Sequence, residues 1–416
     1  MSMQEAWNEK YLRRFLIANG INMWGNSIFF VSIAWVVSQS GGPTAYGYLL
    51  TAYFLGHLPL LLYAGMVVDK LPRRTVALAA DLVEAGIVLS AAFCLLFSLP
   101  LIPTLLVLAF LVGGVSAFSM PAENALLPDL VDENLLSEAN SIRGIIMTIA
   151  WMLGPLTGTF ILFYSNLKVC LLLNVLTFLF SAAILSTIPE VPIDRDDNSG
   201  NIREEISEAF SFVKTQPWLF AGILMFMFWH FWDSMIEVGV PFLIESKDLG
   251  ARSYGIFGAV GATGAMIGSA LSGIWPVPKE KRGLVFYIFI GGIAWSMLFW
   301  AMPIPFWAVL IFVLIEGILG GSLTVIWRTA MADSVDQHLR GRVNSLDAVG
   351  SMIFLPIAPL LGGWLISITN VLTTYSIAVS FMVLTTTIGL LVPSFRNFQR
   401  NPSEKFPLKP SNIDEF

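Results

Sequence analysis

The chain is poor in charge, cysteine and histidine. Lys, Arg, Asp and Glu make up 12% of its 416 residues, and there are 2 cysteines and 3 histidines. Soluble globular domains carry about twice that share of charge, whereas hydrophobic residues reach 56% here and the mean hydropathy is +0.74. A soluble globular protein is therefore excluded, and we expect the chain to be solvated by lipid.

Other absences exclude further classes of protein. Cys94 and Cys170 both lie in apolar runs, so we expect neither a disulfide framework nor a paired-cysteine metal site. No GxxxxGK(S/T) loop occurs, which argues against direct use of ATP, and no basic face or aromatic platform suggests nucleic acid. The few polar residues do not assemble a nucleophile, base and orienting group, so we expect neither an enzyme nor a cofactor.

Long apolar runs fill most of the chain. A helix needs about 20 apolar residues to cross about 30 Å of hydrocarbon. Such windows occur at 13–38, 45–67, 76–97, 101–121, 138–162, 167–189, 218–244, 253–275, 283–302, 306–327, 342–366 and 370–393. We therefore predict an all-α membrane protein with twelve transmembrane helices. The first run follows a basic stretch and contains three asparagines, which favours a span over a cleaved signal peptide.

The basic residues indicate the orientation. The N-terminus, the even connections and the C-terminus hold 20 of the 23 Lys and Arg, while the odd connections hold Lys168, Lys247 and Arg252. Positive charge collects on the cytoplasmic side of membrane proteins. Both termini are therefore expected in the cytoplasm, with the protein in the cell (cytoplasmic or inner) membrane.

A hydrophilic stretch near the middle divides the chain. We predict a first six-helix bundle at 1–189, a cytoplasmic linker at 190–217, a second six-helix bundle at 218–393 and a cytoplasmic tail at 394–416. Within the linker, Ile202, Ile206, Phe210 and Val213 recur at helical spacing and indicate an amphipathic helix on the membrane surface.

An internal repeat supports this division. A shift of 204 residues aligns ten identities without a gap, among them Asp129 with Asp333 and Pro155 with Pro359. Five of the ten are polar or proline positions, where shared membrane composition does not explain a match. Because both copies begin on the same side, the repeat is a parallel one with its axis along the membrane normal, and the two bundles are expected to be pseudo-symmetric.

Three motifs resemble known transporters. GMVVDKLPRR at 65–74 resembles the signature between the second and third spans of the major facilitator superfamily, and GPLTG at 154–158 is similar to the fifth-span motif of its antiporters. PAENALLPDLVDENLLSEANS at 121–141 is similar to a loop of macrolide and multidrug efflux proteins and of related siderophore exporters. The resemblance covers nearly the whole chain and implies export.

The resemblance also implies a cytoplasmic latch. Gly65, Asp69, Arg73 and Arg74 match the signature, and Asp69 is expected to accept hydrogen bonds from a helix N-terminus of the opposite bundle. Asp81 is expected to join this latch by bonding near Arg73 and Arg74, with Asp129 and Asp333 as gate residues; an ordinary solvated turn is the alternative. Two positions depart from the family pattern: Val112 replaces a fourth-span arginine and Val277 replaces the second-half acid.

Ionisable residues inside a membrane are costly and are candidates for function. His230, Asp233 and Glu237 share one face of the seventh span, and Glu316 lies at the middle of the tenth. A carboxyl group held away from water favours its neutral form and can exchange protons near neutral pH. We therefore assign proton coupling to Asp233, Glu237 and Glu316, with structural ion pairing as the alternative.

The resemblance implies a central cavity lined by the first, fourth, seventh and tenth spans. Asn19, Asn22 and Asn26 share a face of the first span, and we expect them to line the cavity together with His230 and the aromatic residues Trp24, Trp229 and Trp232. Packing against lipid or neighbours is the alternative for the aromatics. His57 and His230 with the nearby acids would suit a divalent metal, but we expect hydrogen-bonded packing histidines and no metal site.

The combined prediction is a secondary exporter. It would move an amphipathic neutral or cationic drug-like molecule out of the cytoplasm in exchange for protons by alternating access. We expect a monomer whose partners are the small molecule, protons and membrane lipid, with no nucleic acid. A siderophore exporter, a lipid or lysophospholipid flippase and a divalent metal transporter remain the alternatives.

Overall fold

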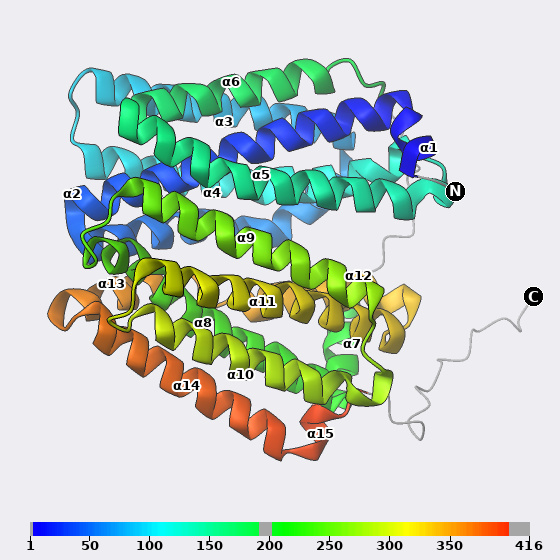
Figure 1. Cartoon of the computed structure of the whole chain (residues 1–416). Coiled ribbons are helices and arrows are strands. Elements are labelled where there is room, and N and C mark those ends of the chain that lie inside the picture. The colour runs from blue at the N-terminus through cyan, green and yellow to red at the C-terminus, as the bar shows by residue number, and fades with distance from the viewer. Residues whose placement is uncertain (1–2, 191–201, 399–416) are drawn as a thin grey trace, which may run out of the picture.

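The computed structural model describes residues 3–190 and 202–398, and within them every regular element is a helix (Figure 1). The first half contains α1 (Met3–Asn8), α2 (Lys10–Lys70), α3 (Arg73–Leu96), α4 (Leu101–Leu126), α5 (Leu136–Tyr164) and α6 (Leu167–Leu185). The second half follows α7 (Ile202–Thr215) and contains α8 (Pro217–Glu245), α9 (Ala251–Ile274), α10 (Arg282–Trp300), α11 (Phe306–Ser334), α12 (Gln337–Met352), α13 (Ala358–Ile368), α14 (Val371–Leu391) and α15 (Pro393–Arg396). Short 3-10 turns at Leu127–Leu130, Glu133–Leu135 and Lys279–Lys281 complete the connections.

Helix α2 contains the first two membrane crossings. Its 61 residues are interrupted at Gly42, where φ is 72° and ψ is −172°. A straight helix of that length would extend about 90 Å, three times the hydrocarbon thickness. Glycine tolerates the positive φ that the reversal requires, and Pro43 begins the returning segment. The short connection predicted between the first two spans is therefore a single non-helical residue.

The eleventh span is broken in two. The sequence predicted one helix at 342–366, but α12 ends at Met352 and α13 begins at Ala358. Pro356 and Pro359 lie in and directly after this break. Proline lacks the backbone N–H and clashes with the preceding turn of a helix, which explains why a continuous apolar run does not form one helix.

In the described residues, ten helices are long and apolar enough to span a membrane, and α13 is a shorter apolar helix. Counting two crossings for α2 and one for α12 with α13, the number of spans is twelve. The predicted fold class is confirmed: an all-α membrane protein with six spans in each half. Figure 1 shows the first half above the second, with the axes of the long helices roughly aligned.

The helices begin and end at two opposite ends of the molecule. We call the end that holds α1, α7 and α15 the terminal end. The opposite end, which holds the turn within α2 and the connections from α5 to α6 and from α8 to α9, is the distal end (Figure 1). The terminal end also holds basic residues at or directly beside the helix ends, namely Lys70, Arg73, Lys281 and Arg282. At the distal end, Lys247 donates from Nζ to the carbonyls of Met302 and Ile304 at 2.9 and 3.2 Å, and desolvation lowers its pKa.

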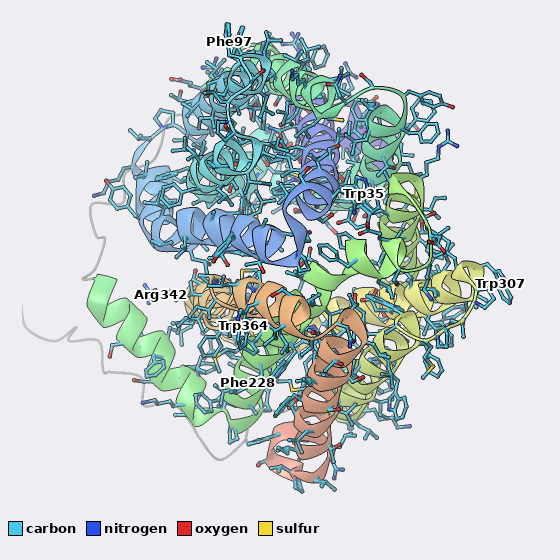
Figure 2. All side chains as sticks on the ribbon, turned by 90° about the vertical axis from the view of Figure 1, so that its left-hand side faces the viewer. Trp35, Phe97, Phe228, Trp307, Arg342 and Trp364 are labelled. Carbon is cyan, nitrogen blue, oxygen red and sulfur yellow. The ribbon has the colours of Figure 1, made fainter. Side chains whose placement is uncertain are left out.

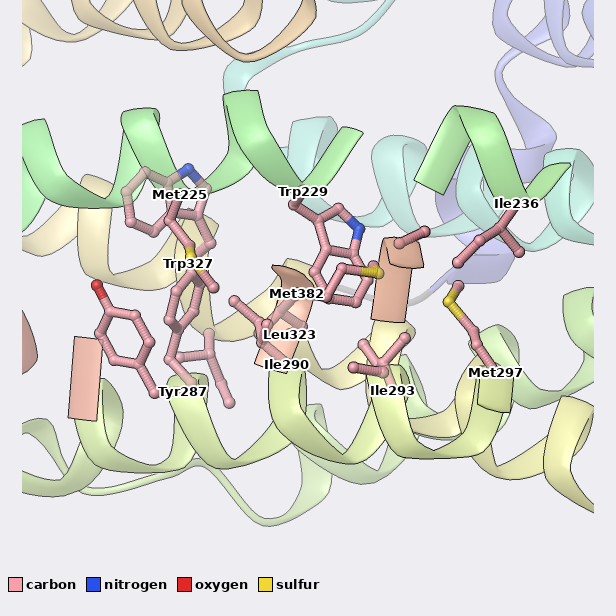
Figure 3. Close-up of a cluster of buried hydrophobic side chains, with 14 of the residues drawn as sticks. Met225, Trp229, Ile236, Tyr287, Ile290, Ile293, Met297, Leu323, Trp327 and Met382 are labelled. Carbon is pink, nitrogen blue, oxygen red and sulfur yellow. The ribbon is translucent and has the colours of Figure 1, made fainter. Parts of the chain in front are cut away.

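Each half has its own apolar core. In the second half, Met225, Trp229 and Ile236 of α8 face Ile290 and Ile293 of α10 (Figure 3). Two further clusters lie mainly in the first half. The one toward the distal end includes Phe29 and Leu105 and is joined by Val238 and Ile366 of the second half, and the one toward the terminal end includes Leu12. Lipid does not drive apolar helices together as water does, so this interlocked packing holds each bundle.

The sequence repeat appears as repeated structure. Asn166 and Asn370 are 204 residues apart, and each caps the sixth span of its half: Asn166 accepts from the Val169 N–H at 3.4 Å and Asn370 from the Thr373 N–H at 2.8 Å. Such caps satisfy donors that a helix leaves free at its N-terminus. The shift that aligns the identities therefore also aligns the helix starts.

The two halves meet at the distal end. A Cβ on Gly255 of α9 would lie 2.7 Å from the Pro155 carbonyl oxygen of α5, and a Cβ on Gly47 of α2 would lie 2.5 Å from the Pro359 carbonyl oxygen of α13. Glycine at both positions lets the backbones approach this closely. Because Pro155 and Pro359 are repeat partners, the two contacts are related by the pseudo-symmetry.

Side chains add to this distal interface. Trp35 of α2 lies where the halves meet (Figure 2), and its ring is 5.6 Å from that of Tyr254 of α9. Gln39 donates to Glu245 at 3.2 Å. Arg252 donates to the Tyr164 hydroxyl at 3.0 Å and stacks over Phe163. These contacts involve both bundles and lie in the distal half of the molecule.

A helix is present at the predicted linker position. Ala209, Phe212 and Val213 of α7 are buried, and the helix packs against α8 and α12. Phe210, which we had placed on the apolar face, is 46% exposed, with the Lys214 ammonium 4.4 Å from its ring. Of the predicted apolar face, Val213 is therefore buried and Phe210 is not, because burial is set by contact with α8 and α12 at the terminal end. The side chains of Ile202 and Ile206 lie outside the described residues, so that part of the face stays a prediction.

Candidate functional site

The second half carries three acids within its membrane spans. Asp233 and Glu237 are one turn apart on α8, and Glu316 is on α11; Asp233 interacts electrostatically with both of the others. Glu237 is exposed, while Asp233 and Glu316 are half-buried. The structure therefore brings together the three residues to which we assigned proton coupling.

Three tyrosines surround these acids. Tyr46 of α2, Tyr254 of α9 and Tyr375 of α14 all interact electrostatically with Glu237, and Tyr375 also interacts with Asp233. Tyr46 and Tyr254 are hydrogen-bonded to each other across the two halves. The Tyr375 hydroxyl is buried and has no hydrogen-bond partner among the described residues. We call these six residues the carboxylate–tyrosine group.

The surroundings of Glu237 show which way the group faces. Tyr46 belongs to the first half, whereas Tyr254 and Tyr375 belong to two different helices of the second. Glu237 thus lies among side chains from both halves and not on the lipid-facing surface. In the described part of the chain, no lysine or arginine forms a salt bridge with Asp233, Glu237 or Glu316. A positive charge placed near them would be stabilised.

His230 belongs to a neighbouring polar cluster. Its Nδ1 is 2.7 Å from the Phe226 carbonyl oxygen, and it interacts electrostatically with Asp347 of α12. Asp347 accepts a hydrogen bond of 2.9 Å from the Trp327 Nε1, and Ser351 donates to it at 3.4 Å. The histidine is thus turned toward α12, while Asp233, one turn later, interacts with Glu316 of α11.

The tryptophans we assigned to the cavity lie in three different places. Trp229 is 8% exposed and packs into the core of the second half (Figure 3). Trp232 stacks on Phe381 of α14 with ring centroids 4.5 Å apart. Trp24 donates from Nε1 to the Thr157 hydroxyl of α5 at 3.3 Å. The structure therefore does not bring these three indoles into contact with one another.

The asparagines of the first span lie in a polar network inside the first half. Asn19 donates to Glu123 at 2.7 Å, Asn22 donates to Asp81 at 2.5 Å, and Asn26 donates to Asn22 at 2.8 Å. Asn174 of α6 donates in turn to Asn26 at 3.3 Å. Asn19 and Asn22 are each 2% exposed. The shared face that we assigned to a cavity is thus turned toward α3, α4 and α6.

Arg143 is the one base in this network among the described residues. It lies within α5, near the start of the predicted fifth span, is 8% exposed and sits 3.6 Å from the Glu123 carboxylate. It also donates to Asn19 at 3.1 Å and to Asn124 at 2.7 Å. The sequence hid this pair because α4 continues to Leu126, five residues beyond the predicted span.

Two of the gate acids are paired with bases at the terminal end. Asp129 forms a salt bridge with Arg73, which also donates to the Ala125 carbonyl. Asp333, its repeat partner, is 2.7 Å from Arg282 and 3.3 Å from Lys279. Each pair joins the end of the fourth span of its half to the start of the third. These bonds fasten helices within a half.

Arg74 and Asp81 differ from the expected latch. Arg74 donates to the carbonyls of Leu185 and Ser186 and pairs with Glu190 at 3.2 Å. Asp81 is 1% exposed and is bonded to Asn22, not to Arg73 or Arg74. Two helical turns separate Asp81 from Arg74, and its side of α3 faces the bundle interior. Our expectation of an Asp81 contact with these arginines is therefore wrong.

The remaining latch residues are less constrained. The side chain of Asp69 lies outside the described residues, so its predicted contact with the opposite bundle stays a prediction. A Cβ on Gly65 would meet nothing within 4 Å, so packing in this conformation does not require glycine there. Any requirement for glycine at this position would have to come from another conformation.

His57 is separated from the second-half acids. Its Nδ1 is 3.0 Å from the Ser116 hydroxyl and 3.2 Å from the Gly113 carbonyl, and its ring stacks on Tyr53. All of these partners are on α2 and α4. Within the described residues, no group of three or more His, Cys, Asp or Glu side chains has the arrangement of a metal site. The histidine-based metal site is thus not assembled here.

Twelve spans in two repeated halves, with acids between them that form no salt bridge in the described part of the chain, are the features of a membrane transport protein. The model of the Major Facilitator Superfamily matches residues 15–346. Because this match covers well over half of the sequence, the chain belongs to the Major Facilitator Superfamily. The fold agrees with that of solved transporters at low sequence identity.

Curated relatives are named as efflux proteins. The chain is 25% identical over 401 residues to the multidrug efflux pump Tap of Mycolicibacterium fortuitum, covering 89% of this chain and 93% of the relative. It is 23% identical over 372 residues to macrolide efflux protein A of Streptococcus pyogenes, covering 86% and 90%. The similarity that the 121–141 segment indicated is confirmed by these matches.

Two solved structures share the architecture. The nucleoside transporter NupG matches with a TM-score of 0.73 at 13% identity, covering 92% of this chain and 98% of that one. The D-xylose–proton symporter matches with a TM-score of 0.71 at 12% identity, covering 94% and 100%. At such identities the likeness shows the fold.

Several site residues were missed by the sequence analysis. Tyr46, Tyr254 and Tyr375 gave no signal, because tyrosine in an apolar run is indistinguishable from packing or interfacial tyrosine. Glu123 was placed in a loop, and Asp347 was not considered. The internal repeat could have pointed to both residues, because a shift of 204 residues places Asp347 at the position of Arg143 and Trp327 at that of Glu123. Both pairs are in contact.

Proposed function

We propose that the protein exports an amphipathic, cationic or neutral small molecule in exchange for protons, with the carboxylate–tyrosine group as its binding and coupling site. The observation that carries this proposal is the position of Glu237, exposed and surrounded by tyrosines from both halves with no basic partner among the described residues. The relatives named as multidrug and macrolide efflux proteins support export.

The electrostatics of the group favour a cation. Three carboxylates that form no salt bridge within the described residues create a negative potential, which an organic cation or protons would neutralise. Tyrosine faces attract cations, and their hydroxyls supply directional hydrogen bonds. The unpartnered Tyr375 hydroxyl is one such donor. Polyanionic cargo such as an acidic siderophore would meet repulsion here.

Mutual exclusion explains how exchange would follow. When Asp233 and Glu237 hold protons, their charge is lost and a cationic cargo is released. When they lose protons, the cargo binds again. Each ligand thus weakens the other by the same factor, as thermodynamic linkage requires. A proton gradient then drives export, provided that both ligands reach the group from only one side at a time.

The distal contacts supply one closed end. Gly47, Gly255 and Trp35 close the distal end by direct contact between the halves, so access to the group in this conformation would come from the terminal end. The basic residues of the terminal end favour its assignment to the cytoplasm. A reporter domain that fluoresces only in the cytoplasm, fused to the C-terminus, tests this assignment: fluorescence is expected.

The decisive experiment uses purified protein in liposomes with an imposed pH gradient. Cationic, neutral and anionic dyes of similar size serve as cargo, and flux is followed by fluorescence. Asp233→Asn and Glu237→Gln are each expected to slow cation flux by about 10- to 100-fold, the equivalent of one charged contact of about 1.5–3 kcal/mol. Flux of the anionic dye is expected to be negligible.

Asp248→Asn is the matched control. Asp248 is an exposed acid on the distal connection with φ of 57°, a conformation that asparagine also adopts readily. It should transport like the unmodified protein. Full cation flux with unchanged gradient dependence in Asp233→Asn and in Glu237→Gln would end the proposal.

One surface feature favours the alternative function, a lipid flippase. An apolar groove of about 580 Å³ lies between α2, α3 and α4, lined among others by Leu60, Val83 and Phe110. It lies within the first half and not between the halves, where alternating access would act. We therefore place lipid transport behind export of a soluble amphipathic molecule, and fluorescent lysolipid in the same flux assay distinguishes the two.

A further inference from the structure

The interior of the first half holds more acid than base. Asp81 and Glu84 of α3, Glu123 of α4 and Arg143 of α5 are each no more than 8% exposed. Arg143 is paired with Glu123 at 3.6 Å, and Asn19 donates to the same carboxylate. Within the described residues, Asp81 and Glu84 form no salt bridge with a base. Among these described residues there are three carboxyl groups and one guanidinium, which is paired with Glu123.

One oxygen of this cluster lacks a partner. Asn22 donates to Oδ1 of Asp81 at 2.5 Å and Ser181 also bonds to this carboxyl group, but Oδ2 is buried with no hydrogen-bond partner among the described residues. A buried carboxylate oxygen with no donor is strongly disfavoured, because water is absent and the charge is not offset. A proton on Oδ2 removes this cost.

Glu84 lies one turn further along α3 and interacts electrostatically with Asp81, Glu123 and Tyr53. Two carboxyl groups so close cannot both be ionised without strong mutual repulsion, and such pairs commonly share a proton. The neighbouring helices of the first half contribute polar groups to this cluster. The titratable and polar groups that face it are Asn19, Asn22 and Tyr53 of α2, Glu123 of α4, Arg143 of α5, and Asn174 and Ser181 of α6.

We propose that Asp81 and Glu84 form a second proton-binding site, enclosed within the first half and distinct from the carboxylate–tyrosine group. The site holds a proton in the conformation described here, where both side chains are at most 2% exposed. It loses the proton when movement of the first span of α2 removes the Asn22 amide and admits water.

The first span of α2 connects this site to the rest of the molecule. Asn19 binds the Glu123 and Arg143 pair, Asn22 binds Asp81, and Trp35 of the same span contacts Tyr254 of the second half at the distal end. A displacement of this span that opens the distal contact therefore also changes the hydrogen bonds of the enclosed acids. Proton occupancy and conformation are then linked, whatever the cargo.

Infrared difference spectroscopy on the full-length protein in lipid tests the site without any transport assay. Acidification from alkaline pH to about pH 6, where exposed carboxyl groups with pKa values of about 4 stay ionised, is expected to produce the carbonyl-stretch band of enclosed protonated carboxyl groups. Aspartate labelled with a heavy carbon isotope separates Asp from Glu. In a triple variant carrying Asp233→Asn, Glu237→Gln and Glu316→Gln, a band from the first half should persist. Addition of Asp81→Asn should remove its aspartate component, and Glu84→Gln its glutamate component.

Neutral amides mimic the protonated acids, so these variants should fold, as judged by unchanged elution on size exclusion. Asp248→Asn serves as the aspartate control and should leave the band unchanged. A triple variant with no residual band, or a band unaffected by both Asp81→Asn and Glu84→Gln, would overturn the proposal. A band abolished by exchange of potassium for sodium at constant pH would also overturn it, in favour of a sodium site. Full, gradient-dependent cargo flux in the triple variant with the first-half band intact would count only against the proposed transport function.

Discussion

The two halves place their intramembrane acids in different surroundings. In the first half, Asp81, Glu84 and Glu123 are enclosed by their own bundle and are held by asparagine amides and Arg143. In the second half, Asp233 and Glu237 lie beside tyrosines from both halves, and Glu237 is exposed. A duplicated fold thus carries an internal network on one side of its axis and an interfacial acidic group on the other.

The repeat positions show how this difference arises. Glu123 and Arg143 of the first half correspond to Trp327 and Asp347 of the second, and both pairs connect the fourth and fifth spans of their half. The contact is kept while its chemistry changes from an ion pair to a neutral donor with an acid. Glu316 corresponds to Val112, which is 5% exposed in an apolar core. Intramembrane acids therefore occupy different repeat positions in the two halves.

The largest expected effect is that of Arg143→Met, which tests whether the first half depends on its ion pair. It leaves Glu123 uncompensated inside the first half, and we expect a loss of stability of about 3–5 kcal/mol, the typical cost of breaking one side of a buried ion pair. Thermal unfolding in detergent measures this. Asp347→Asn at the corresponding position should cost clearly less, because it keeps a hydrogen-bond acceptor for Trp327.

A double variant sharpens this first prediction. Combining Arg143→Met with Glu123→Gln removes both charges, so much of the lost stability should return. If Arg143→Met and Asp347→Asn proved equally mild, the first half would not depend on its ion pair, and the contrast between the halves would fail.

Glu316→Gln tests the acidic side of the comparison. The carboxylate interacts with Asp233, and its removal reduces the negative charge available to a cation or proton. We expect export driven by a pH gradient to fall about tenfold, corresponding to about 1.4 kcal/mol. Glu280→Gln, in an exposed turn at the terminal end, is the matched control. A wild-type rate and an unaltered pH dependence in Glu316→Gln would refute its role.

The distal contacts allow a smaller test of symmetry. Ala at Gly255 or at Gly47 would place Cβ 2.7 or 2.5 Å from a proline carbonyl oxygen of the other half. Overpacking of this kind costs about 1–3 kcal/mol, and it should shift the protein toward conformations that are open at the distal end. Distances between spin labels on α5 and α9 report the shift.

Gly258→Ala is the control for these glycines. Its Cβ would lie 3.4 Å from the Pro155 Cβ, close to ordinary van der Waals contact, so little change is expected. Since Gly47 and Gly255 occupy related contacts, they should respond alike. A response of one without the other would mean that the two halves do not share the closing movement equally.

The smallest effect concerns the ion pairs at the terminal end. The side chains of Asp129 and Asp333 are 18% and 35% exposed, and exposed pairs contribute no more than about 1 kcal/mol. We expect Asp129→Asn to lower the unfolding temperature slightly more than Asp333→Asn. High salt should reduce both effects, and a large loss in either variant would show that these pairs hold more than their own helices.

The site residues that could be predicted from the sequence were those whose residue type is unusual in a membrane span. Asp233, Glu237 and Glu316 were identified because carboxyl groups in apolar spans are rare, and the structure brings them together. Asn19, Asn22 and Asn26 were identified as a polar face, yet periodicity does not reveal which neighbour the face meets. Asp81 was assigned to nearby arginines because it is close to them in sequence. Closeness along a helix does not determine toward which neighbour a side chain points.

The sequence by itself determined the membrane class, the twelve spans and the duplication, because these follow from hydrophobic run length, the need to satisfy backbone groups in lipid, and a repeat shift of 204 residues. Only the tertiary structure decided which acids are enclosed within one bundle and which lie between the halves. That choice depends on the rotation of each helix about its axis. Rotation is set by interlocking side chains such as Trp229 against Ile293 and by close backbone approach at Gly47 and Gly255.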